Sequence, residues 1–174
     1  MSIERGVMAL AAEQTAFMQQ ILPLTTADRY WQPAPDAWSA LQVMEHLVLV
    51  DELVAAQLPD ASVRPNARWG RAAILLMRLA SGAGAKVRVP LADIVPRGEA
   101  NLDQLVHRWH LASEALWTIV RERSRRAEAV LLTHPVAGPL SCVDGLAFLR
   151  EHIRHHRRQL DRLAELRRWE RDLG

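Results

Sequence analysis

The sequence predicts an all-α protein folded as a four-helix bundle. Four long segments carry apolar residues at helical spacing, their starts or ends coincide with capping or helix-breaking residues, and no stretch shows a convincing β-strand pattern. Four such amphipathic helices can bury their apolar stripes in one shared core. A chain of 174 residues, 49% of them hydrophobic, is long enough to build that core. We therefore interpret residues 1–174 as one domain.

The first two helices are recognised by their boundaries. The first is predicted over residues 3–22, because Pro23 follows it. The second is predicted over residues 40–58, where Ser39 and Gln42 form a capping box at its start. Both segments carry enough apolar residues to pack against partner helices.

Residues 59–100 form the least regular part of the sequence. A short apolar segment at residues 69–79 predicts an extra helix. The flexible segment 81–84 and a proline-containing loop up to Gly98 follow it. We expect a short extra helix and a long loop between the second and third long helices.

The last two helices have clear capping residues. Asn101 with Gln104 opens the third helix, which is predicted to reach about residue 127. Residues 133–140 are predicted to form a loop. Ser141 and Asp144 then cap a final helix of about 31 residues, or roughly 46 Å.

Composition narrows the class of protein. The chain has 22 basic and 20 acidic residues, and this small excess does not by itself indicate nucleic-acid binding. A single cysteine excludes an intrachain disulfide and fits a reducing compartment. The sequence shows neither a signal-peptide pattern nor an apolar run long enough to span a membrane. We expect a cytoplasmic protein without nucleic-acid or membrane partners.

Two histidines one helical turn apart are the most informative residues of the last helix. On a helical projection, His156 lies about 20° and His152 about 60° from the centre of the apolar stripe, whereas His155 lies about 120° away. The first two therefore face the core, and the third faces solvent or a partner. Two histidines at this spacing can bind a single metal ion.

His46 lies in the buried stripe of the second helix and is a third inward histidine. A buried imidazole without a partner loses hydrogen bonds worth about 1–3 kcal/mol, so three of them need an explanation. Either one metal ion is held by all three, or each is satisfied separately by a carbonyl, a water or a carboxylate. Three histidines would leave an open coordination position, which is typical of catalytic sites. Imidazole suits zinc, nickel, iron and copper alike.

The other histidines, the cysteine and the arginines of the last helix are mostly interpreted as residues outside the metal site. His107 and His110 flank Trp109 and are expected at the surface. His134 either overhangs the metal site or is an ordinary loop histidine. The helix N-terminus is expected to lower the thiol pKa of Cys142. Several arginines form a solvated face of the last helix, and one or two of them could bind a substrate carboxylate: Arg150, Arg154, Arg157, Arg158 and Arg162.

Several short motifs follow one another in a fixed order. They are Trp38-Ser39, Glu45-His46-Leu47, the segment 134–141, Phe148-Leu149, and His152-x-x-x-His156 with Gln159-Leu160. In this order they resemble the DinB-like (DinB/YfiT) superfamily, whose members are regarded as metalloenzymes. The resemblance covers about residues 5–168 and is most specific in its three histidines.

The resemblance implies an up-up-down-down four-helix bundle, a divalent metal ion, and frequently a homodimer. Matched residue by residue, the metal ligands are His46, His152 and His156, the same three that face inward. His134 and Gln159 are further candidates for the pocket.

The chain departs from the family pattern at two places. At Asp144-Gly145, where an acidic residue followed by tryptophan is frequent, we expect a smaller side chain near the pocket mouth. Asp51 and Glu52 are expected to point away from the buried stripe. Neither departure removes a predicted metal ligand.

Characterised relatives include a thiol-dependent isomerase and thiol transferases that join bacillithiol, mycothiol or glutathione to electrophiles. The resemblance therefore implies a metal-dependent enzyme, with zinc or nickel, that activates a low-molecular-weight thiol or water for attack on a small-molecule electrophile. The alternative is a non-enzymatic, homodimerising metal-binding module. No catalytic residue beyond the ligands is assigned.

Overall fold

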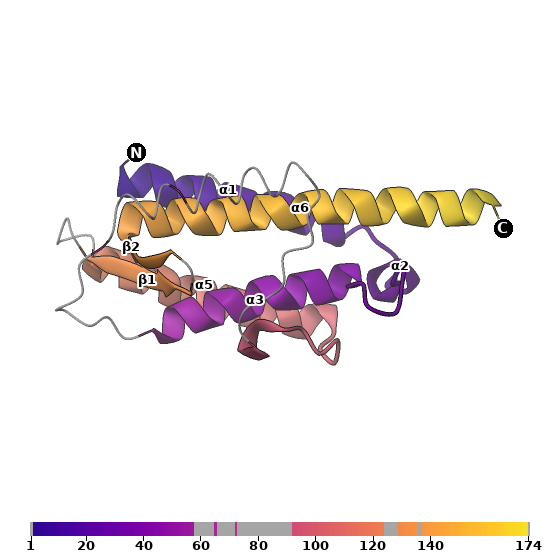
Figure 1. The fold of residues 1–174 in the computed structure, drawn as a ribbon, viewed down its shortest axis with the longest axis horizontal. Helices are drawn as coiled ribbons and strands as arrows, with labels where there is room; N and C mark the ends of the chain where they lie inside the picture. Colours follow the sequence, from indigo (N-terminus) through magenta and orange to yellow (C-terminus); the bar gives the residue numbers. More distant parts are fainter. Residues whose placement is uncertain are drawn as a thin grey trace.

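The computed structural model describes residues 2–57, 65, 72, 92–123, 129–135 and 137–173. Four long helices dominate this part of the chain: α1 (Ile3–Ile21), α3 (Ala40–Ala56), α5 (Leu102–Arg123) and α6 (Cys142–Leu173). Shorter elements join them, namely α2 (Thr26–Tyr30), the 3-10 turn η1 (Ala92–Ile94), and the strands β1 (Val130–His134) and β2 (Gly138–Ser141). Figure 1 shows that α6 runs past the end of the other long helices.

The four long helices enclose one hydrophobic core. α1 lies along α6, and α3 lies along α5 (Figure 1). The two pairs meet where Phe17 of α1 packs edge-on against Trp109 of α5, with ring centroids 5.4 Å apart. The core includes fully buried side chains from all four: Leu10, Met44, Leu47, Leu105, Leu116 and Leu149. The predicted all-α four-helix bundle is confirmed.

The order of helix directions differs from the expected one. Glu13 pairs with Arg157, and Gln20 bonds to Asp161, so positions along α1 and α6 increase together and the helices are parallel. α3 and α5 both run the opposite way (Figure 1). The order is up, down, down, up, because the short connection through α2 turns the chain back before α3 begins.

The helix starts predicted from capping residues are confirmed. Ser39 Oγ accepts a hydrogen bond from the Gln42 backbone, and Gln42 Oε1 accepts one from the Ser39 backbone, at 3.2 and 2.9 Å. Asn101 and Gln104 make the same reciprocal pair, with both distances 2.9 Å. Ser141 Oγ accepts from the backbone three residues later. Each of these signals is local, so the sequence reveals it.

A β-hairpin replaces the predicted loop at residues 133–140. β1 and β2 pair antiparallel, and the turn between them ends at Gly138, whose φ of 71° favours glycine. The prediction of a loop over residues 133–140 was therefore wrong. Strands of five and four residues are too short to show a clear alternating pattern.

Gly145 of α6 lies directly against the hairpin. A Cβ added there would come within 2.9 Å of the Leu131 side chain, so glycine permits the close approach of α6 and β1. The smaller side chain expected at this position therefore lies against Leu131 of the hairpin, and its place near a pocket mouth stays a prediction.

Apart from residue 72, the predicted extra helix at residues 69–79 lies outside the described residues. So do the segment 81–84 and residues 124–127 at the end of the third predicted helix. Among the helices that the structure does describe, none combines the length and the hydrophobicity needed to cross a membrane.

Candidate metal centre

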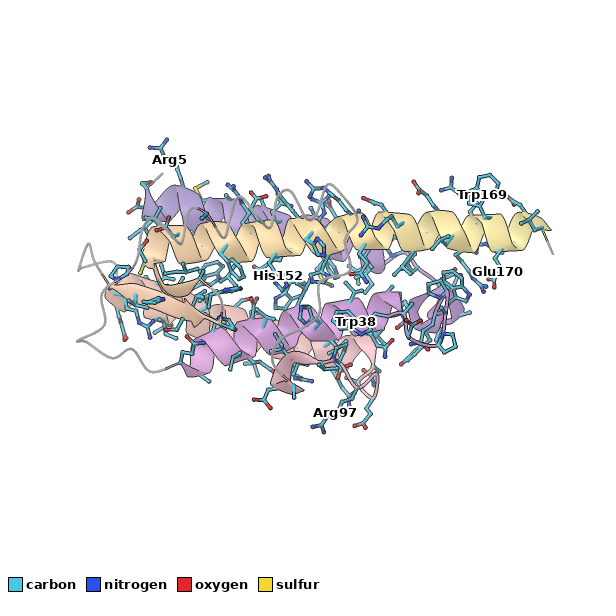
Figure 2. All side chains as sticks on the ribbon, viewed as in Figure 1. Arg5, Trp38, Arg97, His152, Trp169 and Glu170 are labelled. Atoms are coloured by element: carbon cyan, nitrogen blue, oxygen red, sulfur yellow. The ribbon has the colours of Figure 1, made fainter. Side chains whose placement is uncertain are left out.

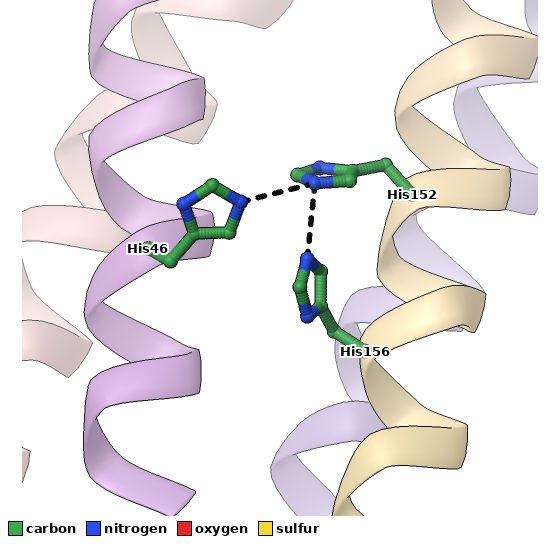
Figure 3. Close-up of side chains that lie close together, drawn as sticks. All are labelled: His46, His152 and His156. Carbon is green, nitrogen blue, oxygen red and sulfur yellow. Dashed lines mark hydrogen bonds between the residues drawn. The ribbon is translucent and has the colours of Figure 1, made fainter. Parts of the chain in front are cut away.

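The three histidines selected from the sequence come together between α3 and α6. His152 points from α6 into the space beside α3 (Figure 2), and its Nε2 lies 3.2 Å from Nε2 of His46 and 3.1 Å from Nε2 of His156 (Figure 3). One ring nitrogen from each residue lies within 4.8 Å of the others. Ligand nitrogens of a tetrahedral metal site stand about 3.3 Å apart when the bonds are about 2.0–2.1 Å. The arrangement can therefore hold a metal ion.

The outer nitrogens of two of these rings have hydrogen-bond acceptors. His46 Nδ1–H donates to the Ile94 carbonyl at 2.7 Å, and His156 Nδ1–H donates to Gln159 Oε1 at 2.9 Å. Because a protonated Nδ1 leaves a lone pair on Nε2 of a neutral imidazole, both rings aim a lone pair at the centre. Such outer bonds are usual for histidines that bind metals.

Burial keeps the three imidazoles neutral. It lowers the pKa of His46, and burial together with repulsion between the rings holds the pKa of His152 and His156 well below the usual range. Hydrogen bonding among the three rings is incomplete, since the single Nε2 proton that His152 can carry cannot fully serve both neighbouring lone pairs. A cation at the centre would satisfy all three.

Two aromatic rings line the cluster. Trp38, from the loop before α3, lies 5.0 Å from the His46 ring and stacks near His156 at 6.3 Å. Phe148 stacks near His152 at 6.0 Å, with 14° between the ring planes. The sequence places both residues in the motifs of the family resemblance, but it did not predict their contact with the cluster. The spacing of four residues between Phe148 and His152 was the signal that could have revealed it.

His155 stays outside the cluster, as its helical position predicted. Its ring nevertheless packs against His156, at 4.9 Å and 84°, and the residue is half-buried. The expectation that it simply faces solvent or a partner therefore needs correction. Gln159, a pocket candidate, contacts the cluster through its bond to His156.

His134 lies at the end of β1 and contacts a ring that itself lines the cluster. It packs against Phe148 at 4.7 Å, and its Nδ1 accepts a hydrogen bond from the Ala137 backbone. Phe148 in turn stacks on His152. A role for His134 in the pocket stays a prediction.

The remaining histidines of α5 and the cysteine lie apart from the three rings. His107 and His110 are exposed, as predicted. Cys142 is buried, and burial raises its thiol pKa, with a smaller opposing effect from Arg123. The predicted lowering by the helix N-terminus is wrong, since desolvation of the thiolate outweighs it.

The acidic residues of α3 occupy unexpected positions. Asp51 is 3% exposed and accepts hydrogen bonds from Trp109 Nε1 at 2.7 Å and Gln14 Nε2 at 3.3 Å. The prediction that it points away from the buried stripe is therefore wrong, because the buried indole N–H needs an acceptor. Glu52 is half-exposed and pairs with Arg108 at 2.6 Å.

A comparison with protein families gives a match that covers the region of the three histidines. Residues 9–160 match the DinB superfamily, and this segment contains all three clustered histidines. None of the curated proteins and none of the solved structures compared with the chain matches it. Because the family match covers most of its length, the chain belongs to the DinB superfamily.

Proposed function

We propose that this protein is a metal-dependent enzyme in which His46, His152 and His156 hold a divalent cation. The observation that carries the proposal is the convergence of three Nε2 atoms between α3 and α6, two of them on rings whose outer N–H groups are already bonded. Three protein ligands leave a fourth position for a reactant, as in catalytic sites. Zinc and nickel both accept imidazole ligands and are the metals that we propose.

The chemistry we propose is transfer of a low-molecular-weight thiol to a small electrophile. A divalent cation lowers the pKa of a bound thiol or water toward neutrality. The thiol would release its proton to solvent, its sulfur would bond to the electrophilic carbon, and the leaving group would depart with the electron pair of the broken bond. With water as the nucleophile, the same centre would hydrolyse the electrophile.

The chain's own residues prepare this chemistry. The Ile94 carbonyl and Gln159 orient the His46 and His156 rings, and burial keeps these rings neutral and able to bind a cation. Trp38 beside the His46 ring gives the cluster an apolar wall that limits the access of water.

Metal analysis of the purified protein tests the proposal. After expression with added Zn²⁺ or Ni²⁺, we expect one ion per chain in the wild type and in His155→Ala, and loss of the ion in His152→Ala. His155→Ala is a matched control, since it removes a neighbouring half-buried imidazole that lies outside the cluster. If the wild-type protein contains no bound metal after expression with added metal, the proposal is contradicted.

Activity is tested separately on the loaded protein. Thiol-conjugation assays would combine several low-molecular-weight thiols with several electrophiles, and we expect turnover that His152→Ala abolishes. Consistent inactivity of the loaded wild type would favour the alternative, a homodimerising metal-binding module.

One observation favours that alternative. The end of α6 that extends past the bundle exposes Leu166, Trp169 and Leu173 by 50%, 67% and 83%. Their spacing of three and four residues places them on one face, and Trp169 extends away from the helix (Figure 2). Light scattering of the wild type and Trp169→Glu tests it, with a dimer expected only in the wild type.

A further inference from the structure

The arginines of α6 fall into two sets. Five of them pair with carboxylates: Arg150 with Glu151, Arg154 with Glu13 and Glu151, Arg157 with Glu13, and both Arg167 and Arg171 with Asp28. Arg158, Arg162 and Arg168 have no hydrogen bond or ion pair to any part of the chain that the structure describes. Within the described part of the chain, therefore, no carboxylate competes with a ligand for this second set.

Two members of the unpaired set lie near the histidine cluster. Arg158 and Arg162 follow His155 by three and seven residues, so all three lie along one side of α6. The His155 ring packs against His156 at 4.9 Å. Arg162 is half-buried, and its charge contributes to lowering the pKa of both histidines.

Within the described part of the chain, the charged side chain that acts on the cluster is a positive one, that of Arg162. Other imidazoles and Arg162 are the charged or titratable groups that act on the pKa of the cluster histidines, and no carboxylate of the described residues is among them. Neutral ligands leave the full charge of a divalent cation uncompensated. The balancing charge would then come from the bound reactant.

We propose that Arg158 and Arg162 form an anion-binding subsite beside the metal centre, which binds a carboxylate or phosphate group of the thiol or the electrophile. This inference rests on the proposed function, since it names the substrate class of the same site. Guanidinium groups suit this task because their N–H donors match the oxygens of both anions.

The experiment compares charged and neutral thiols on Co²⁺-loaded protein. Binding of 3-mercaptopropionate, of 2-mercaptoethyl phosphate and of the uncharged methyl ester of 3-mercaptopropionate is followed by the visible absorption of Co²⁺. We expect a charged thiol to bind the wild type about tenfold more tightly than the ester. The two charged probes show whether carboxylate or phosphate is preferred.

Arginine variants test whether the tighter binding of charged thiols, relative to the ester, depends on the subsite. Arg162→Gln should reduce it to within about twofold, and Arg158→Gln should reduce it less. Arg168→Gln, which removes another unpaired arginine further along α6, should retain it. Comparing variants cancels differences in thiol pKa, and unchanged ester affinity shows that the metal centre is intact.

The outcomes separate the two proposals. If the loaded wild type binds charged thiols no better than the ester, or if Arg162→Gln keeps the full advantage, the subsite is overturned and the metal centre stands. A protein that takes up no Co²⁺ overturns the proposed function and the subsite together.

Discussion

Helix α3 contributes a buried polar residue to each of two sites that are satisfied in different ways. Asp51 receives hydrogen bonds from Trp109 and Gln14, on two other helices. The lone pair of His46 instead points toward a second imidazole, in a cluster with too few protons for its acceptors. A buried polar group whose hydrogen bonds are satisfied within the chain contributes to the fold, whereas a set of groups whose hydrogen bonding is incomplete is suited to a ligand.

The largest expected difference between the two sites is in how much a bound metal ion stabilises the folded protein. Zn²⁺ at about a thousandfold excess over its Kd should stabilise the wild type by about 4 kcal/mol. His152→Ala should abolish this gain, because a ligand is lost, while His155→Ala should keep it. Urea unfolding with and without Zn²⁺ measures the effect. Equal stabilisation of His152→Ala would show that the ion binds elsewhere.

A change at the Asp51 site should affect the fold and spare metal binding. Trp109→Phe removes the donor to Asp51 and part of the ring that contacts Phe17. We expect a loss of about 3 kcal/mol in the free energy of unfolding, measured for the metal-free protein in urea. Metal stoichiometry should stay unchanged. Loss of metal together with this change would show that the sites are coupled.

Asp51→Asn removes the charge of this side chain while keeping nearly the same shape. Burial raises the pKa of Asp51 from 3.8 to about 6, and the nearby Glu52 adds to the rise. The proton is therefore held more tightly in the folded state. Its stabilising contribution is full below about pH 4 and is lost as pH rises through about 6.

Asp51→Asn should not lose stability as pH rises through about 6, because its side chain does not titrate. It should exceed the wild type by about 2 kcal/mol at pH 7.5, somewhat less than the roughly 3 kcal/mol that the shift implies, because the amide NH₂ replaces a carboxylate oxygen. Near pH 4 the difference should vanish. Unfolding free energies at the two pH values provide the check, and a pH-independent difference would show that Asp51 does not titrate as described.

The sequence reveals features that depend on neighbouring residues better than features that depend on distant ones. The capping pair Ser39 and Gln42 and the inward direction of His152 and His156 follow from spacing within one helix. The acceptor for His46 is a backbone carbonyl 48 residues away, at Ile94. Any residue type supplies a carbonyl, so no sequence signal marks it.

The fold shows the same limit. Helix boundaries were predicted closely, yet the hairpin of β1 and β2 was not, because its strands are stabilised by packing on α5 and α6. The burial of Asp51 depends on Trp109, which lies 58 residues further along the chain. Helical periodicity gives the face of each helix, but it does not show which partner meets that face.

The smallest expected effect concerns the residue that orients a metal ligand. Gln159 Oε1 accepts the Nδ1 proton of His156, which fixes the tautomer that points Nε2 at the cluster. Gln159→Leu removes this acceptor and should weaken Zn²⁺ binding about tenfold, or about 1.4 kcal/mol, in competition with a chromogenic chelator. Gln159→Glu keeps an acceptor at the same length and should retain wild-type affinity. If the leucine variant binds Zn²⁺ as tightly as the wild type, packing alone orients His156, and the contrast with Asp51 would then rest on the incomplete bonding of the three inner nitrogens.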